Sequence, residues 1–190
     1  MYICPRIAYD KNTFTTEALP MKNIVLIGMP GTGKSTVGKA LAERFGYDFV
    51  DADDLIVQTT GKTLPEILRQ DGLEAFYEIE NKVGTDLNRT HTVIATGGSM
   101  VLYPEAMAHL KEGSTVIWLQ TPFSQLEKRM PADLYDRGIA VPAGTPLREI
   151  YEERCVLYAR YADLIVVSQD GESDTARLVE DVMRTVGLET

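Results

Sequence analysis

Residues 28–35, GMPGTGKS, carry the clearest chemistry in the sequence. They match the pattern G-x-x-x-x-G-K-[ST], and they stand between an apolar run typical of a strand and an amphipathic segment typical of a helix. Such a turn lets backbone N–H groups converge on phosphate oxygens, while Lys34 reaches the terminal phosphates and the Ser35 hydroxyl contacts Mg²⁺. The implied ligand is a nucleoside triphosphate, most simply ATP with Mg²⁺.

Three acids, Asp51, Asp53 and Asp54, follow the second predicted strand. In an extended chain Asp51 and Asp53 point to the same side, so both are expected beside the phosphate-binding turn. Asp51 can hold a metal through water, and Asp53 can accept a hydrogen bond from a hydroxyl group that is to be phosphorylated. The alternative is that these acids cap the next helix, a role that best suits Asp54.

Two charged residues, Glu80 and Arg154, fall on apolar faces of predicted helices. Burying a charge without a partner costs several kcal/mol, so each needs a partner. A structural ion pair between the two and contact with a hydroxylated ligand are both open. Thr96-Gly97-Gly98-Ser99 follows the third predicted strand. Its glycines indicate either a close approach of another molecule or a tight turn.

The apolar pattern predicts elements that bring these residues together. Five short β-rich runs alternate with segments of helical spacing, which favours a mostly parallel sheet covered on both faces, with ligands at the carboxyl ends of its strands. The predicted strands are Asn23 to Ile27, Asp48 to Asp51, Thr92 to Ala95, Thr115 to Leu119 and Leu164 to Val167.

Residues 130–146 break this alternation because five of them are glycine or proline. The segment cannot form a regular helix, and long loops of this kind are often lids over a substrate site. A passive surface loop is the alternative.

Length and composition exclude several classes of protein. The chain has 190 residues, about the size of one domain, and a net charge of −9, so nucleic acid is an unexpected partner,. Only two cysteines are present, and no apolar run is long enough to cross a bilayer,. We expect a cytoplasmic monomer, with residues 1–20 as an N-terminal extension and residues 21–190 as a single domain.

Together these residues resemble the shikimate kinase family over nearly all of residues 23–167. The resemblance implies a P-loop kinase of the α/β class: a five-stranded parallel sheet flanked by helices, with a lid and a substrate-binding helical region. It also implies transfer of the terminal phosphate of ATP to the 3-hydroxyl of shikimate, a step of aromatic amino-acid biosynthesis. The motifs that carry it are the phosphate-binding turn, Asp51-x-Asp53, Phe76-x-x-x-Glu80, Gly97-Gly98, an arginine in the lid, and Arg154 followed by Leu157-Tyr158.

The same resemblance assigns roles to individual residues. Lys34, Asp53 and Arg137 would be catalytic, with Arg137 closing over the phosphates, and Ser35 and Asp51 would serve the metal. The nucleotide would be bound by Gly31, Thr32, Gly33, Lys34, Ser35, Thr36 and Arg137. The acceptor would be held by Asp53, Tyr77, Glu80, Gly97, Gly98 and Arg154.

The chain departs from the family pattern mainly on the acceptor side. Tyr77 stands where the family has an arginine that grips the carboxylate of shikimate, and Ser99 replaces the third glycine of Gly-Gly-Gly. The lid has Arg137-Gly138-Ile139 in place of Arg-Pro-Leu. Two alternatives follow: a kinase for a different small hydroxylated metabolite, and a nucleotide-binding module without catalysis.

Overall fold

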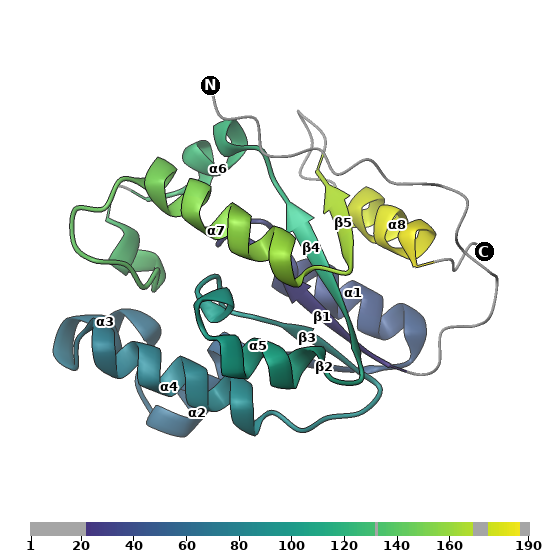
Figure 1. The fold of residues 1–190 in the computed structure, drawn as a ribbon, viewed down its shortest axis with the longest axis horizontal. Helices are drawn as coiled ribbons and strands as arrows, with labels where there is room; N and C mark the ends of the chain where they lie inside the picture. Colours follow the sequence, from purple (N-terminus) through teal and green to yellow (C-terminus); the bar gives the residue numbers. More distant parts are fainter. Residues whose placement is uncertain (1–21, 132, 169–174, 187–190) are drawn as a thin grey trace.

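The computed structural model describes residues 22–131, 133–168 and 175–186. The predicted extension of residues 1–20 lies outside the described residues. Five parallel strands form one sheet in the order β2-β3-β1-β4-β5 (Figure 1). Each strand agrees with its predicted range to within one residue at either end, and the bounds are β1 Asn23–Ile27, β2 Asp48–Asp51, β3 Thr92–Ala95, β4 Ser114–Gln120 and β5 Leu164–Val167.

Helices cover both faces of the sheet, as the alternating pattern predicts. Val25 and Ile27 of β1 belong to the apolar cluster under α5 (Pro104–Lys111) and α7 (Leu147–Tyr161). Ile24 and Leu26 belong to the cluster under α1 (Lys34–Phe45) and α8 (Thr175–Thr185). Side chains alternate between faces along a strand, so a central strand needs apolar residues at every position. Figure 1 shows these two helical layers.

Three further helices form a group beside the sheet: α2 (Ala52–Thr60), α3 (Leu64–Gln70) and α4 (Leu73–Asp86) (Figure 1). They have an apolar cluster of their own, in which Ile56, Ile67 and Phe76 are fully or almost fully buried. Ala140 belongs to the same cluster. The segment predicted as a lid therefore packs against these helices.

The remaining elements are short. They are the 3-10 turn η1 (Met100–Leu102), the helix α6 (Phe123–Arg129) and the 3-10 turn η2 (Leu134–Arg137). Among the described residues of 130–146, η2 is the only helix or strand, as the glycine and proline content of this segment predicts. Within the described ranges, no helix has both the length and the apolar character needed to cross a membrane.

The topology brings the polar segments of the sequence to one edge of the sheet. Parallel strands have their carboxyl ends at the same edge. β1 lies between β3 and β4: the connection after β1 runs toward β2, whereas the connection after β4 runs the other way, toward β5,. The phosphate-binding turn follows β1, Asp51 ends β2, and Thr96 begins the loop after β3. These three segments are adjacent because each lies at the carboxyl end of a strand in the same parallel sheet.

Candidate active site

The phosphate-binding turn leads directly into α1. Gly33 is the N-cap of α1 and has a φ of 90°, a left-handed conformation that a side chain would strain,. The turn therefore reaches the first residues of α1, whose N–H groups have no partner within the helix. Ser35 and Thr36 are exposed there and line a cavity at this edge of the sheet. This is the geometry of an anion site at a helix N-terminus.

The Lys34 ammonium is held by the turn itself. Its Nζ donates to the carbonyl oxygens of Gly28 (2.8 Å) and Met29 (3.0 Å). An ammonium group has three donors, so one is left for a ligand. Burial lowers the pKa of Lys34 to about 8, while the nearby carboxylates of Asp53 and Asp51 raise it. A bound triphosphate would add negative charge and favour the charged form further.

The acids after β2 are arranged differently from the prediction. We expected Asp51 and Asp53 to share one side of an extended strand and Asp54 to be the helix cap. Instead β2 ends at Asp51, and the side chain of Asp51 is the N-cap of α2, accepting a hydrogen bond from the Asp53 N–H (3.0 Å). Asp53 and Asp54 lie in the first helical turn, and Asp53 lines the cavity. The chain turns into a helix because a cap satisfies an N–H group that would otherwise lack a partner.

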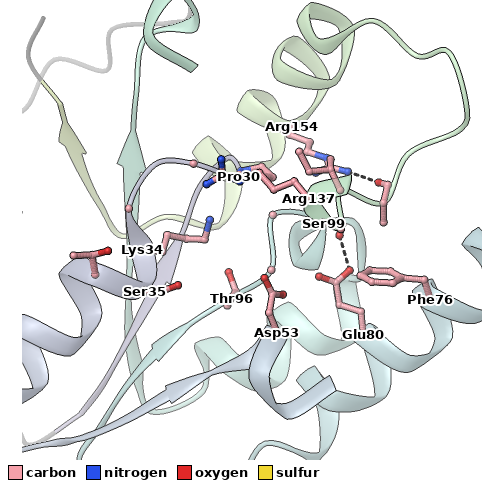
Figure 2. Close-up of a pocket in the computed structure, with 18 residues that line it drawn as sticks. Pro30, Lys34, Ser35, Asp53, Phe76, Glu80, Thr96, Ser99, Arg137 and Arg154 are labelled. Carbon is pink, nitrogen blue, oxygen red and sulfur yellow. Dashed lines mark hydrogen bonds between the residues drawn. The ribbon is translucent and has the colours of Figure 1, made fainter. Parts of the chain in front are cut away.

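Asp53 is poised to accept a hydrogen bond. Its Oδ1 atom is buried and has no hydrogen-bond partner. Burial, followed by the charge of Asp51, raises the pKa of Asp53 to about 6, while Lys34 lowers it. Asp53 lines the cavity (Figure 2), and its Oδ1 is an acceptor without a partner.

Glu80 faces the same cavity from α4 and is completely buried. Its Oε2 accepts hydrogen bonds from Ser99 Oγ (2.6 Å) and Tyr103 OH (3.0 Å), and its Oε1 has no hydrogen-bond partner. Burial raises the pKa of Glu80 to about 7, although the hydrogen bond from Ser99 lowers it. Gly97 packs so closely that a Cβ there would lie 2.1 Å from Oε1, so only glycine fits.

Arg154 is the third buried polar group of the cavity. Only 2% of its surface is exposed; its Nη2 donates to the carbonyl oxygen of Ala140 (2.8 Å), and its Nη1 has no partner. Among the described residues no salt bridge joins Glu80 and Arg154. The structural ion pair considered above is therefore absent, because the guanidinium binds the lid backbone instead (Figure 2).

The lid segment closes one side of the cavity. Arg137, Gly138, Ile139 and Ala140 line it, and the backbone of Gly138 lies against Leu64 of α3. Arg137 is exposed and its Nη1 donates to the carbonyl oxygen of Arg129 (3.1 Å). The predicted lid arginine is thus at the cavity wall beside the phosphate-binding turn.

Of the remaining predicted site residues, some line the cavity and others do not. Gly31, Gly33, Gly97 and Gly98 line the cavity. Gly98 packs against Pro30, and this contact joins the loop after β3 to the phosphate-binding turn. Asp51, Thr32 and Tyr77 are not among the lining residues. Thr32 is buried within the turn, and the Tyr77 hydroxyl donates to the Ala140 carbonyl oxygen at 3.5 Å, outside the cavity.

The donor set is compatible with Mg²⁺. Within the described ranges no cluster of three or more histidine, cysteine or acidic side chains is arranged to hold a metal. Magnesium, however, is usually bound by one or two protein oxygens together with water and substrate phosphates. Ser35 lines the cavity, and Asp53 has an unpartnered buried carboxylate oxygen. An ion of this kind fits a site in which the nucleotide supplies the other ligands.

Some contacts were not visible in the sequence. Arg129 Nη1 donates to the Gly31 carbonyl oxygen (3.1 Å), and Tyr158 OH donates to the Gly98 carbonyl oxygen (2.6 Å), so each steadies a loop of the site. Tyr103 reaches Glu80 from a loop that no motif marks. These partners are at least 23 residues apart, and no spacing rule within one element relates them,.

The cavity has a volume of about 220 Å³ and adjoins the phosphate-binding turn, so it offers room for a small metabolite,. Fold and site together define an ATP-dependent small-molecule kinase with a phosphate-binding loop. A family model described as shikimate kinase matches residues 30–186. The chain belongs to the shikimate kinase family.

Individual relatives agree with this assignment. The shikimate kinase of Synechococcus sp. (strain RCC307) is 41% identical over 168 residues, which cover 86% of this chain and 85% of that protein. The shikimate kinase of Persephonella marina is 38% identical over 154 residues, covering 80% and 92%. A structure of shikimate kinase from Acinetobacter baumannii in complex with shikimate superposes with a TM-score of 0.76 at 30% identity, covering 86% of this chain and 92% of that one.

Proposed function

We propose that this protein transfers the terminal phosphate of ATP to the 3-hydroxyl of shikimate. The observation that carries the proposal is the set of three buried, unpartnered polar atoms around one cavity: Asp53 Oδ1, Glu80 Oε1 and Arg154 Nη1. Unpaired buried polar groups are costly, so a ligand with complementary groups is expected. Two acceptors and one cationic donor suit a molecule with hydroxyl groups and a carboxylate.

The residues of the chain divide the work between nucleotide and acceptor. The turn and Lys34 hold the terminal phosphates in place, and Asp53 accepts a hydrogen bond from the hydroxyl that attacks. The bond between the terminal phosphorus and the bridging oxygen breaks, and that oxygen leaves with ADP. The bond from phosphorus to the acceptor oxygen forms, and the hydroxyl proton passes to the Asp53 carboxylate and then to solvent. Arg137, at the cavity wall, stabilises the charge on the transferred group,.

The metal belongs to the same proposal. Ser35, with Asp51 or Asp53 acting through water, would hold Mg²⁺ beside the phosphates. Bound there, the ion would neutralise charge on the phosphate oxygens. The chain itself orients the reactants and excludes water, and we infer that residues 130–146 open to admit the acceptor and then close. A cytoplasmic monomer is also part of the proposal, and light scattering in solution would measure the mass.

A different hydroxylated acid is the second candidate acceptor. It is favoured by the position of Tyr77, whose hydroxyl bonds to the lid backbone, so that position 77 adds no second guanidinium beside that of Arg154. One guanidinium alone contacts a carboxylate less strongly than two would.

A coupled assay of ADP release with ATP, Mg²⁺ and a panel of acceptors tests the proposal. The panel should contain shikimate, related cyclic hydroxy acids, sugar acids and amino-acid alcohols. We expect shikimate to give the highest kcat/KM and Asp53→Asn to reduce its turnover at least about a hundredfold. Higher turnover with another acceptor would establish the second candidate. Equal ADP release by wild type and Asp53→Asn, with no acceptor dependence, would indicate a nucleotide-binding module without kinase activity.

A further inference from the structure

The two oxygens of the Glu80 carboxylate have different surroundings. Oε2 accepts both hydrogen bonds that Glu80 receives, from Ser99 Oγ (2.6 Å) and Tyr103 OH (3.0 Å), whereas Oε1 accepts none. Ser99 and Glu80 are both buried, at 4% and 0% exposure. Two donors on one oxygen fix the plane of the carboxylate and leave the other oxygen for a different partner.

The free oxygen of Glu80 lies next to the free oxygen of Asp53. A Cβ atom on Gly97 would be 2.1 Å from Glu80 Oε1 and 3.0 Å from Asp53 Oδ1, so both oxygens lie on the same bare side of Gly97. Figure 2 shows the carboxylates of Asp53 and Glu80 at the cavity, with the hydrogen bond from Ser99 to Glu80 as a dashed line. An acceptor that gives one hydroxyl to Asp53 can therefore give a second hydroxyl to Glu80.

We propose that Ser99 and Tyr103 are positioning residues, which hold the Glu80 carboxylate through Oε2 with Oε1 presented to a second hydroxyl group of the acceptor. The inference rests on the proposed function, because it concerns the same phosphorylation reaction. It assigns a role to Ser99, the residue that replaces a family glycine.

The charge state of Glu80 depends on every group around it. Burial raises the pKa of Glu80 to about 7; the Ser99 hydrogen bond lowers it, the charge of Asp53 raises it, and the Tyr103 hydrogen bond and the charge of Arg154 lower it. Removing either hydroxyl group therefore favours the protonated form at neutral pH. The ionisable groups that surround the carboxylate are Lys34 of α1, Asp53 of α2, Tyr77 of α4, Tyr103 before α5, and Arg154 and Tyr158 of α7.

Kinetics of Ser99→Ala and Tyr103→Phe, which each remove one hydroxyl, test the proposal. We expect each to raise the acceptor KM about tenfold and to leave the ATP KM within about twofold. The acid limb of the pH profile of acceptor kcat/KM should move to higher pH in both. Matched controls are Ser114→Ala, at the buried start of β4, and Tyr47→Phe, before β2, which should match wild type. A purely structural role would change stability but not the pH profile.

Titration of the Glu80 carboxyl carbon by ¹³C NMR, assigned with Glu80→Gln, provides a readout that needs no substrate. The midpoint should be higher in Ser99→Ala and Tyr103→Phe than in wild type and unchanged in the two controls. If wild type phosphorylates shikimate but neither variant moves the midpoint or the acid limb, the positioning role is wrong and the proposed function stands. If wild type does not phosphorylate shikimate, the proposed function fails, and an unchanged midpoint would refute the positioning role separately.

Discussion

The proposed nucleotide half of the active site is built mainly from the consecutive residues 28–36, with Arg137 of the lid, whereas the proposed acceptor half is built from side chains of α2, α4, α7 and the loop after β3. In the nucleotide half the Lys34 ammonium is already held by two carbonyl oxygens of its own turn. In the acceptor half, polar atoms of Asp53, Glu80 and Arg154 are buried without partners.

In the nucleotide half the chain itself supplies partners for its polar groups, whereas in the acceptor half the ligand must supply the hydrogen-bond partners. A backbone turn can bind phosphate with groups that are fixed by its own conformation. The buried polar atoms without partners in the acceptor half gain their hydrogen bonds only when an acceptor binds. Such a pocket discriminates strongly against ligands that leave one of these atoms unpaired. We therefore expect changes in the first half to affect the reaction with every acceptor, and changes in the second half to affect the choice of acceptor.

Lys34→Ala should produce the largest loss. The variant removes the cation that we propose contacts the terminal phosphates, and a loss of about 10²- to 10³-fold in kcat/KM is expected for any acceptor. The ADP-release assay measures it. Lys39→Ala is the matched control, because Lys39 is exposed on the same helix. A loss for one acceptor only would contradict the separation of the two halves.

Glu80 should make the stability of the protein depend on pH. Its pKa is about 7 in the folded protein against an ordinary value of 4.5, so the folded state binds more protons than the unfolded state between these values. Stability attributable to Glu80 is therefore present below pH of about 4.5 and is lost as pH rises through about 7, by roughly 3 kcal/mol at most.

Denaturant unfolding of wild type and Glu80→Gln over this pH range checks the sign. The free energy of unfolding of wild type should fall relative to that of Glu80→Gln as pH rises. Parallel curves would mean that the carboxyl group does not titrate between these pH values. Glu78→Gln, an exposed change on the same helix, is a suitable control.

Arg154→Lys should impair acceptor binding specifically. Lysine keeps the charge but lacks the planar fork that serves both the Ala140 carbonyl oxygen and a ligand, so the acceptor KM should rise about 10- to 100-fold,. The ATP KM should stay within about twofold. Arg160→Lys, exposed on the same helix, should behave as wild type. An equal rise in both KM values would place Arg154 in the nucleotide half.

Tyr77→Arg is expected to have the smallest effect and the opposite sign. A second guanidinium near Glu80 and Arg154 would contact the carboxylate of shikimate and lower its KM about tenfold. Tyr77→Phe, which removes only the 3.5 Å hydrogen bond to Ala140, should change little. Unchanged or weaker binding of shikimate by Tyr77→Arg would favour a different natural acceptor.

Much of the fold could be predicted because its signals are local. The strands are short apolar runs between breaks, and each was located to within one residue at either end. The phosphate-binding turn was equally visible, since its motif is contiguous and its context is a strand and a helix.

The details of the acceptor half depend on contacts that no local pattern contains. The prediction that Asp54 caps α2 was wrong. The strand already ends at Asp51, and the side chain of Asp51 is the N-cap of α2. Spacing showed that Glu80 and Arg154 are buried, but their separate partners, Ser99 and Ala140, became visible only in three dimensions.

A crystal structure with shikimate and ADP tests the central claim most directly. We predict hydroxyl groups of shikimate on Asp53 Oδ1 and Glu80 Oε1 and its carboxylate on Arg154 Nη1, so that all three buried atoms gain a partner. Shikimate bound elsewhere, or bound in this cavity with those three atoms still unpaired, would contradict the account.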